Sequence, residues 1–345
     1  MRILVIGATG FIGPHLVSLF LQRGFEIAAL SRATSESNLP EGVARISGDR
    51  NRIAESRDEI AQFSPDIVVD LILSSVRQAA ELMNTLRGIA HRVVAISSAD
   101  VYRACGIFHG FESGPLQQTL LTEDSELRIK REVYPPQLIQ HLKQIFGWLD
   151  DEYDKIGVEE IVQSEPSLPG TVLRLPMVYG PGDRLHRFWP YLKRMDDDRP
   201  AILMQEDIAL WRSPRGYVEN VAAAIALATM DDRAAGRIYN ITEQPSFSEE
   251  EWVNKIASAV GWSGKIIKLA KEKLPSHLRV SGRCEQDWAV SSDRIRRELG
   301  YVEPVSERAA LERTIAWERA NPSGVFRQVF DYPAEDQALA AIVFS

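Results

Sequence analysis

The chain has 345 residues, of which 45% are hydrophobic and 26% are charged, and it carries a formal net charge of −8 with an isoelectric point near 5.4. This length exceeds one ordinary core and indicates one large domain or two modest ones. The acidic balance gives no general attraction to nucleic acid or to an anionic membrane, so neither is an expected partner. No apolar run reaches the ~18 residues of a membrane span, and the only cysteines, Cys105 and Cys284, form no CxxC pair. We therefore expect a soluble, cytoplasmic protein without a disulfide framework.

Strands and helices alternate along the first half of the chain. Near-continuous apolar runs predict strands at 2–7, 25–32, 44–49, 65–73 and 91–98, and helical spacing of apolar residues predicts helices at 11–23, about 52–63 and 77–89. Apolar strands separated by amphipathic helices are typical of a parallel sheet covered on both faces. We expect an α/β fold with a doubly wound, Rossmann-type parallel sheet, whose ligands bind at the carboxyl ends of the strands.

The second half of the chain is less regular. Residues 170–183 begin as a strand and end in a Gly/Pro turn, 216–229 indicate a helix and 236–242 another strand, followed by short helices. The expected organisation is a dinucleotide-binding domain of residues 1–178 and 215–243, with a smaller, discontinuous substrate-binding lobe of residues 179–214 and 244–345.

The glycines of GATGFIG lie between the first expected strand and the first expected helix. Gly7, Gly10 and Gly13 fall three residues apart, which permits a tight turn and a close approach of the backbone to a pyrophosphate. The N-terminus of the following helix supplies free N–H donors and a partial positive charge to such an anion. Because strand, glycine turn, helix and second strand occur in this order, the segment predicts a dinucleotide site.

Several motifs taken together resemble those of the extended short-chain dehydrogenases/reductases, the NAD-dependent epimerase/dehydratase family, in an atypical form. The similar segments are GATGFIG (7–13), AISSADVY (95–102), LTEDSEL (121–127), VLRLPMVYGPGD (172–183), RGYVENVAAAIALA (215–228), YNIT (239–242) and SDRIRRELGY (292–301). The resemblance covers about residues 1–320.

The resemblance also implies which residues bind ligands. Cofactor contacts are expected from the glycine turn and the strand ends, at Gly7, Thr9, Gly10, Phe11, Ile12, Gly13, Ser31, Arg32, Asp49, Leu73, Ser97, Lys155, Pro176 and Val178. Substrate contacts are expected from Tyr102, Tyr179 and Arg215, with a simple ion pair as the alternative for Arg215. No metal site is expected, because the six histidines lack the spacing of zinc ligands.

The residues at the end of the second expected strand indicate which cofactor binds. An acidic residue there would accept hydrogen bonds from both ribose hydroxyls of NAD, but the sequence has Ser31 and Arg32 and no acid before Glu36. A guanidinium suits a 2′-phosphate, so we expect NADP, with NAD as the second choice. Stacking of Arg32 over adenine is the alternative. Asp49 is expected either at the adenine edge or as a turn-forming residue.

The family's catalytic group is a Ser, here Ser98, with a Tyr-x-x-x-Lys pair on one helix face. Lys155 aligns with that Lys, but Asp151 then stands at the Tyr position and Tyr153 lies two residues late. Another phenol, Tyr134, is followed by two prolines that oppose a helix. We expect Ser98 to hold the reacting oxygen, Lys155 the nicotinamide ribose, and Tyr153 to move the proton. This requires the helix to begin near Tyr153 with an irregular first turn.

These features predict an NADP-dependent oxidoreductase, epimerase or dehydratase that acts by hydride transfer on a sugar, polyol or small carbonyl compound. The alternative is a non-catalytic dinucleotide-binding regulator or an RNA-associated member of the family. An insertion at roughly 103–150 separates Ser98 from Tyr153 and is expected as a lid or an interface decoration. Expected partners are a small-molecule substrate and, as one option, a second copy of the chain.

Overall fold

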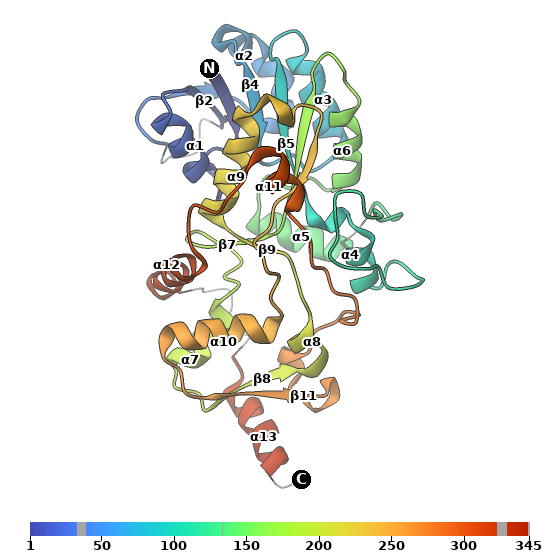
Figure 1. Ribbon diagram of the computed structural model, residues 1–345, viewed down its shortest axis with the longest axis vertical. Helices are drawn as coiled ribbons and strands as arrows, with labels where there is room; N and C mark the ends of the chain where they lie inside the picture. The colour runs from blue at the N-terminus through green and yellow to red at the C-terminus, as the bar shows by residue number, and fades with distance from the viewer. Residues whose placement is uncertain (33–38, 133, 323–329, 344–345) are drawn as a thin grey trace.

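A seven-stranded parallel sheet forms the centre of the fold in the computed structural model, which describes residues 1–32, 39–132, 134–322 and 330–343 (Figure 1). Its strands are β1 (Arg2–Ile6), β2 (Glu26–Ser31), β3 (Val43–Ser47), β4 (Ile67–Asp70), β5 (Arg92–Ser98), β6 (Gly170–Leu175) and β10 (Ile238–Asn240). Their order is β10-β6-β5-β4-β1-β2-β3, and neighbouring strands pair in parallel. The order reverses at β1 and β4, where sheets of this kind bind their ligands. The doubly wound sheet predicted from the sequence is confirmed.

Helices cover both faces of this sheet. They are α1 (Gly13–Gln22) and α9 (Val218–Met230) on one face, with α2 (Arg57–Phe63), α3 (Val76–Leu86) and α6 (Lys155–Gln163) on the other. Successive strand residues point to opposite faces, so Ile3 and Val5 pack in the cluster with α1 and α9, while Leu4 and Ile6 pack in the cluster with α2 and α3. Both faces are therefore buried, as the apolar strands predict.

Two elements differ from their sequence predictions. The helix expected over about 52–63 is a 3₁₀ segment, Arg50–Ser56, followed by α2. The strand expected within 170–183 breaks at Pro176, because proline lacks the N–H that a central ladder requires. β6 stays in the main sheet, whereas β7 (Met177–Tyr179) pairs with β9 (Arg215–Tyr217).

A second group of elements lies below the main sheet in Figure 1. They are α7 (Trp189–Asp196), β8 (Ala201–Gln205), α8 (Glu206–Leu210), α10 (Glu249–Val260), β11 (Lys265–Leu269) and α13 (Tyr332–Val343). β8 and β11 form a two-stranded parallel sheet. These elements come from the segments 179–214 and 244–345, and we propose them as the substrate-binding lobe.

Part of segment 244–345 returns to the main sheet. There α11 (Asp293–Leu299) packs beside β10, while α12 (Glu307–Ala320) contacts α10. Short 3₁₀ turns lie at Ala99–Val101, Asp232–Ala234, Lys271–Lys273 and Ser276–Leu278. None of the helices in the described part of the chain combines the length and the apolar character needed to cross a bilayer.

The insertion at 103–150 contains α4 (Arg103–Phe108) and α5 (Pro136–Ile145). The expectation that the prolines after Tyr134 oppose a helix is wrong, since α5 begins at Pro136 with Pro135 as its N-cap. Proline fits the first helical position because its missing N–H has no intrahelical partner to lose there. Phe108 stacks on Trp211 with 4.5 Å between ring centroids, so α4 packs against the second group.

Candidate functional site

The glycine turn between β1 and α1 leaves no room for side chains. Gly7 has a φ of +86°, and a Cβ on it would lie 2.8 Å from Ile72 Cγ2. A Cβ on Gly13 would lie 2.2 Å from the carbonyl oxygen of Ala8, and the amide of Gly10 donates to the carbonyl of Gly7 at 3.0 Å. The glycines therefore form the expected tight turn that opens α1, and the close approach of this backbone to a pyrophosphate stays a prediction.

The start of α1 has free donors for an anion. Its N-cap is Ile12, which makes no side-chain hydrogen bond to the first turn. The first N–H groups of a helix have no intrahelical partner, and they carry the positive end of the helix dipole. Thr9 is exposed, and Phe11 and Ile12 are half-buried beside it. This cradle fits the pyrophosphate of a dinucleotide, the group for which the motif is predicted.

Ser31, Arg32 and Asp49 follow the strands at the adenosine side of the expected site. The Oγ of Ser31 is buried and has no hydrogen-bond partner among the described residues, and Arg32 is exposed directly after β2. Asp49 caps the 3₁₀ segment by accepting a hydrogen bond from the amide of Asn51 at 2.9 Å, so it acts as the turn-forming residue. Glu36 lies outside the described residues.

A buried ion pair that the sequence analysis missed lies at the same edge of the sheet. Arg50 Nη2 lies 2.9 Å from Asp70 Oδ2 and donates to the carbonyl of Gln78 at 3.1 Å. Its Nε and Nη1 are buried without a partner among the described residues. Two unmatched donors at the ends of β3 and β4 favour an acceptor-rich ligand there, as a nucleotide is.

Lys155 is the first residue of α6, and its ammonium lies inside the fold. The Nζ donates to the carbonyl of Leu73 and, at 2.9 Å, to the carbonyl of Ile96. Burial lowers the pKa of Lys155 to about 8, against opposing attraction from Asp100 and Asp70. The ammonium thus connects two backbone segments through these carbonyls. This structural role is additional to the ribose contact predicted for Lys155.

Tyr153 and Tyr134 converge on one buried carboxylate. The Tyr153 hydroxyl donates to Asp100 Oδ2 at 2.6 Å, and the Tyr134 hydroxyl lies 3.2 Å from the same oxygen. The Asp100 amide in turn donates to Ser98 Oγ at 3.2 Å, which brings Tyr153 and Ser98 into one cluster. On its other side, Asp100 Oδ1 lies 3.7 Å from Arg128 Nη2. Neither Asp100 nor Tyr134 was predicted for the site, although Asp100 lies two residues after Ser98.

The position of Tyr153 before α6 explains how it reaches Asp100. Asp154 is the N-cap, and its Oδ1 accepts from the amide of Gly157 at 3.0 Å, so α6 begins only at Lys155. Tyr153 therefore lies outside the helix, and the helical phase does not direct its side chain. Asp151, the alternative at this position, is exposed, pairs with Lys143 at 2.6 Å and lines a cavity that Tyr153 also lines.

A cavity of about 440 Å³ opens beside the two phenols. Tyr134 and Tyr153 line it together with Val76, Ile139 and Arg131, so it joins residues from the insertion to residues before α6. Burial and the Asp100 carboxylate raise the pKa of both tyrosines well above the ordinary tyrosine value. Both phenols are accordingly held in the protonated form at neutral pH.

Two predicted ligand contacts, Ser97 and Tyr102, lie instead in a buried network. Ser97 Oγ donates to Glu159 Oε1 at 2.5 Å, and Glu159 pairs with Arg174 at 2.7 Å. The Tyr102 hydroxyl accepts from Arg174 at 2.9 Å and donates to Asn240 at 2.6 Å. Their exposed fractions are 2% and 0%, so the structure gives these side chains a role in the core that the sequence did not reveal.

The predicted contacts around β7 and β9 are also engaged within the protein. Tyr179 is buried and donates to Glu243 Oε2 at 3.0 Å, and Arg215 pairs with Glu249. The structure thus shows an ion pair at Arg215, while Nε and Nη1 of its guanidinium are buried without a partner among the described residues, so the substrate contact stays a prediction. Val178 is buried, Pro176 lies at the break between β6 and β7, and Leu73 offers its carbonyl to Lys155.

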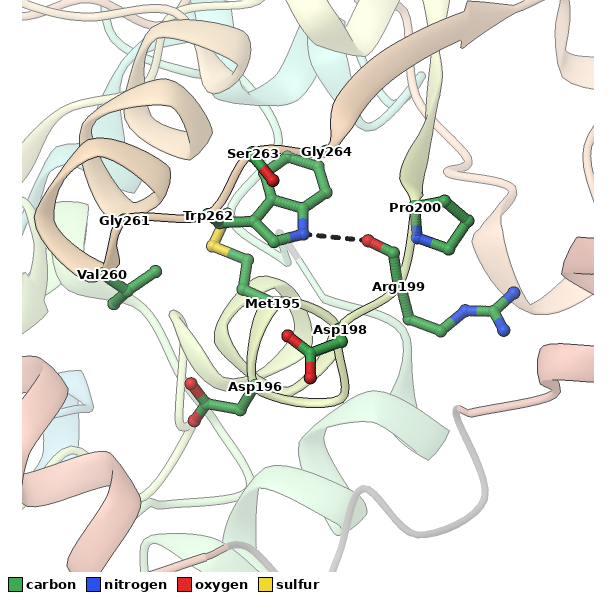
Figure 2. Close-up of a pocket in the computed structure, with 10 residues that line it drawn as sticks. All are labelled: Met195, Asp196, Asp198, Arg199, Pro200, Val260, Gly261, Trp262, Ser263 and Gly264. Carbon is green, nitrogen blue, oxygen red and sulfur yellow. Dashed lines mark hydrogen bonds between the residues drawn. The ribbon is translucent and has the colours of Figure 1, made fainter.

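A second cavity, of about 540 Å³, lies where the ends of α7 and α10 meet (Figure 2). Its lining includes Asp196, Asp198, Arg199 and Trp262, whose indole Nε1 donates to the carbonyl of Arg199 at 2.9 Å. None of the predicted catalytic or cofactor residues lines it. We therefore place the candidate site at the glycine turn and the Asp100 cluster.

Comparison with known proteins agrees with this geometry. Residues 3–109 match the model of the NAD dependent epimerase/dehydratase family. The chain is 25% identical over 270 residues to 2'-dehydrokanamycin reductase of Streptomyces kanamyceticus, a match that covers 76% of this chain and 67% of that protein. It is 26% identical over 282 residues to 3-diazoavenalumate denitrifying reductase of a Streptomyces species, covering 76% and 82%.

Solved structures share the fold. MoeE5 in complex with UDP-glucose and NAD superposes with a TM-score of 0.65 at 21% identity, covering 94% of this chain and 100% of that one. The resemblance to the NAD-dependent epimerase/dehydratase family that the motifs predict is confirmed, because residues 3–109 match the model of that family and the fold is shared with solved structures such as MoeE5. A nicotinamide dinucleotide is the cofactor that these findings support.

Proposed function

We propose that the protein is an NADP-dependent reductase of a keto-sugar or another small carbonyl compound. The observation that carries the proposal is the 2.6 Å hydrogen bond from Tyr153 to Asp100, at the carboxyl end of β5 beside Ser98. It gives a phenol both a proton partner and a place next to the predicted cofactor cradle. The names of the two curated relatives, both reductases, support reduction as the direction.

Ser98 and Tyr153 have different roles in the proposed reduction. A bound nicotinamide dinucleotide supplies the hydride. Ser98 donates a hydrogen bond to the carbonyl oxygen, and Tyr153 transfers its proton to that oxygen as the carbon accepts the hydride. Because burial and Asp100 hold the pKa of Tyr153 well above its usual value, a free tyrosinate is unfavourable. The tyrosinate formed by this transfer therefore recovers a proton from solvent through the cavity that Tyr153 lines.

Tyr134 supports this arrangement. It lines the cavity and donates to the same Asp100 oxygen as Tyr153, so it helps to hold the carboxylate that orients the Tyr153 hydroxyl. NADP is preferred over NAD in this proposal because Arg32 and the Ser31 hydroxyl, which has no partner among the described residues, stand where an acidic residue would bind the ribose of NAD.

The test compares cofactor binding with turnover. We expect NADPH to bind more tightly than NADH in calorimetry, and NADPH to be oxidised by one or more members of a panel of ketones, aldehydes and keto-sugars. Tyr153→Phe should lower turnover by about 10²–10⁴-fold without changing NADPH affinity, and Asp100→Asn should lower it as well. Tyr332→Phe is the matched control, because Tyr332 also donates to a carboxylate, Asp197 at 2.5 Å, but lies on α13. Full activity of Tyr153→Phe would remove this residue from the mechanism.

A non-catalytic dinucleotide-binding module is the second candidate. It is favoured by the two hydrogen bonds that the Lys155 ammonium donates to backbone carbonyls. These bonds use donors of the ammonium that was predicted to contact the cofactor. NADPH binding without oxidation by any member of the panel would support this candidate.

A further inference from the structure

Arg50 reaches across the carboxyl edge of the main sheet, beside the glycine turn. It follows β3, whereas its partner Asp70 is the last residue of β4, and β1 and β2 stand between these two strands. Asp70 Oδ1 accepts from the amide of Ile72 at 3.0 Å, and a Cβ on Gly7 would lie 2.8 Å from Cγ2 of the same Ile72. The ion pair therefore lies next to the turn and to the reversal of strand order, where the dinucleotide is expected.

Only one nitrogen of the Arg50 guanidinium has a partner in the described part of the protein. Its Nη2 lies 2.9 Å from Asp70 Oδ2 and donates to the carbonyl of Gln78 at 3.1 Å. Nε and Nη1 are buried and have no partner among the described residues, and Arg50 as a whole is 7% exposed. Buried N–H groups without an acceptor are unfavourable, so this side chain favours a ligand that brings acceptors.

A second polar group without a partner ends the neighbouring strand. Ser31 is the last residue of β2 and is in register with Ser47, the last residue of β3. Ser31 is 9% exposed, and its Oγ has no hydrogen-bond partner among the described residues. Asp49, in contrast, accepts from the amide of Asn51 within the turn. The groups left for a ligand at these strand ends thus include two guanidinium nitrogens and a hydroxyl, all of which can donate.

The contact with Asp70 determines which acceptors suit Arg50. The Asp70 carboxylate is fully buried and matches the charge of the guanidinium. A 2′-phosphate would have to lose its hydration to reach a side chain this deeply buried, and no unmatched positive charge would compensate for that loss. Uncharged acceptors, such as adenine ring nitrogens and ribose oxygens, are buried at lower cost. The exposed Arg32 is the side chain proposed for the 2′-phosphate.

We infer that Arg50 binds the adenosine half of the dinucleotide by donating from Nε and Nη1 to uncharged acceptors of the base or the ribose. Asp70 positions the guanidinium for these contacts. The inference rests on the proposed function, because it concerns the cofactor of the same enzyme. Arg50 should therefore contribute equally to the affinities for NADPH and NADH, whereas Arg32 contributes to that for NADPH alone.

Calorimetric titration of the full chain with NADPH and with NADH tests this inference. Arg50→Lys keeps a positive charge beside Asp70 but removes the guanidinium nitrogens. We expect it to weaken the binding of both dinucleotides by the same factor, at least tenfold. Arg52→Met is the matched control, because Arg52 lies in the same 3₁₀ segment but is exposed and pairs with Glu55 at 3.4 Å; it should change neither affinity.

A crystal structure of the wild type with NADPH identifies the acceptor. Nε or Nη1 of Arg50 should lie about 2.7–3.2 Å from an adenosine atom, and that atom shows whether the base or the ribose is bound. A contact of these nitrogens with the 2′-phosphate, or with no part of the cofactor, would overturn the inference. So would an unchanged affinity of folded Arg50→Lys, or a loss confined to NADPH.

Thermal unfolding checks that Arg50→Lys is folded. If it is not, the double variant Arg50→Met/Asp70→Asn, which removes both charges of the pair, should show the same equal loss; if that variant is also unfolded, the crystal structure decides. Binding of both dinucleotides without turnover of any carbonyl compound would count against the proposed reductase and leave this inference intact. Absence of binding of either dinucleotide to the wild type would refute it.

Discussion

The buried ammonium of Lys155 connects three elements by hydrogen bonds. Lys155 begins α6, and its ammonium is held by a carbonyl that follows β4 and by one within β5. The neighbouring Asp100 performs a comparable task for the phenols of Tyr153 and Tyr134. At the residue scale, the site is thus arranged by two buried ionisable groups whose partners come from distant parts of the chain.

The titration of Lys155 should be visible in the stability of the protein. Its pKa is lowered to about 8 in the folded state, against about 10.4 in an unfolded chain. Between these values the unfolded chain binds more protons, so the Lys155 contribution to the free energy of unfolding should rise with pH from about 8 to about 10.4. Lys155→Met lacks this contribution.

Urea denaturation across that pH range measures the prediction. The difference in free energy of unfolding should move in favour of the wild type as the pH rises. Lys143→Met, which removes a surface lysine paired with Asp151, serves as the control. A difference that does not vary with pH would contradict a buried, charged Lys155.

The elements were more predictable than the site. The strands of the main sheet follow from apolar runs, and the glycine turn follows from its spacing, because burial and steric limits act locally. Tyr153 was harder to interpret, since its direction depends on the residue at which α6 begins. The Asp154 N-cap marks that start, and it separates Tyr153 from the helical phase. Asp100 was missed because its partner Tyr134 comes from the insertion, 34 residues further on.

The turn before α1 gives a prediction at the element scale. A methyl group on Gly13 would lie 2.2 Å from the carbonyl oxygen of Ala8, so the first turn of α1 must move in Gly13→Ala. Strain of this kind costs about 1–3 kcal/mol, and displacement of the helix N-terminus should weaken NADPH binding at least tenfold. Gly147→Ala is the control, because nothing lies within 4 Å of a Cβ there. Equal NADPH affinity of the two variants in calorimetry would show that the turn does not form the cofactor cradle.

At the scale of the whole molecule, one buried carboxylate of α13 joins this helix to other elements of the second group. Glu335 of α13 is 1% exposed and pairs with Arg194 of α7 at 2.5 Å and with His277 at 3.0 Å. This contact joins residues 141 positions apart. It fixes α13 against a lobe that is assembled from separate segments.

Removal of the Glu335 carboxylate should lower the free energy of unfolding. Glu335→Ala leaves Arg194 buried without its partner, and breaking a buried pair in this way costs about 3–5 kcal/mol. Asp336→Ala removes the adjacent carboxylate, which is exposed and pairs with Arg199; surface pairs of this kind contribute about 0–1 kcal/mol. Chemical denaturation of both variants measures the contrast. Similar losses in the two variants would refute the role assigned to Glu335.

The position of β10 late in the chain affects how the sheet forms during synthesis. Its residues, Ile238–Asn240, complete the edge of the sheet beside β6, and α9 covers the face packed by α1. A nascent chain that ends at residue 178 therefore exposes both the β6 edge and the apolar face of α1. At a synthesis rate of about 5–20 residues per second, the ribosome needs roughly 3–12 s to add the chain up to β10. During this interval the sheet, which lacks only β10, presents the open β6 edge to its surroundings, and chaperones that bind nascent chains would act on it there.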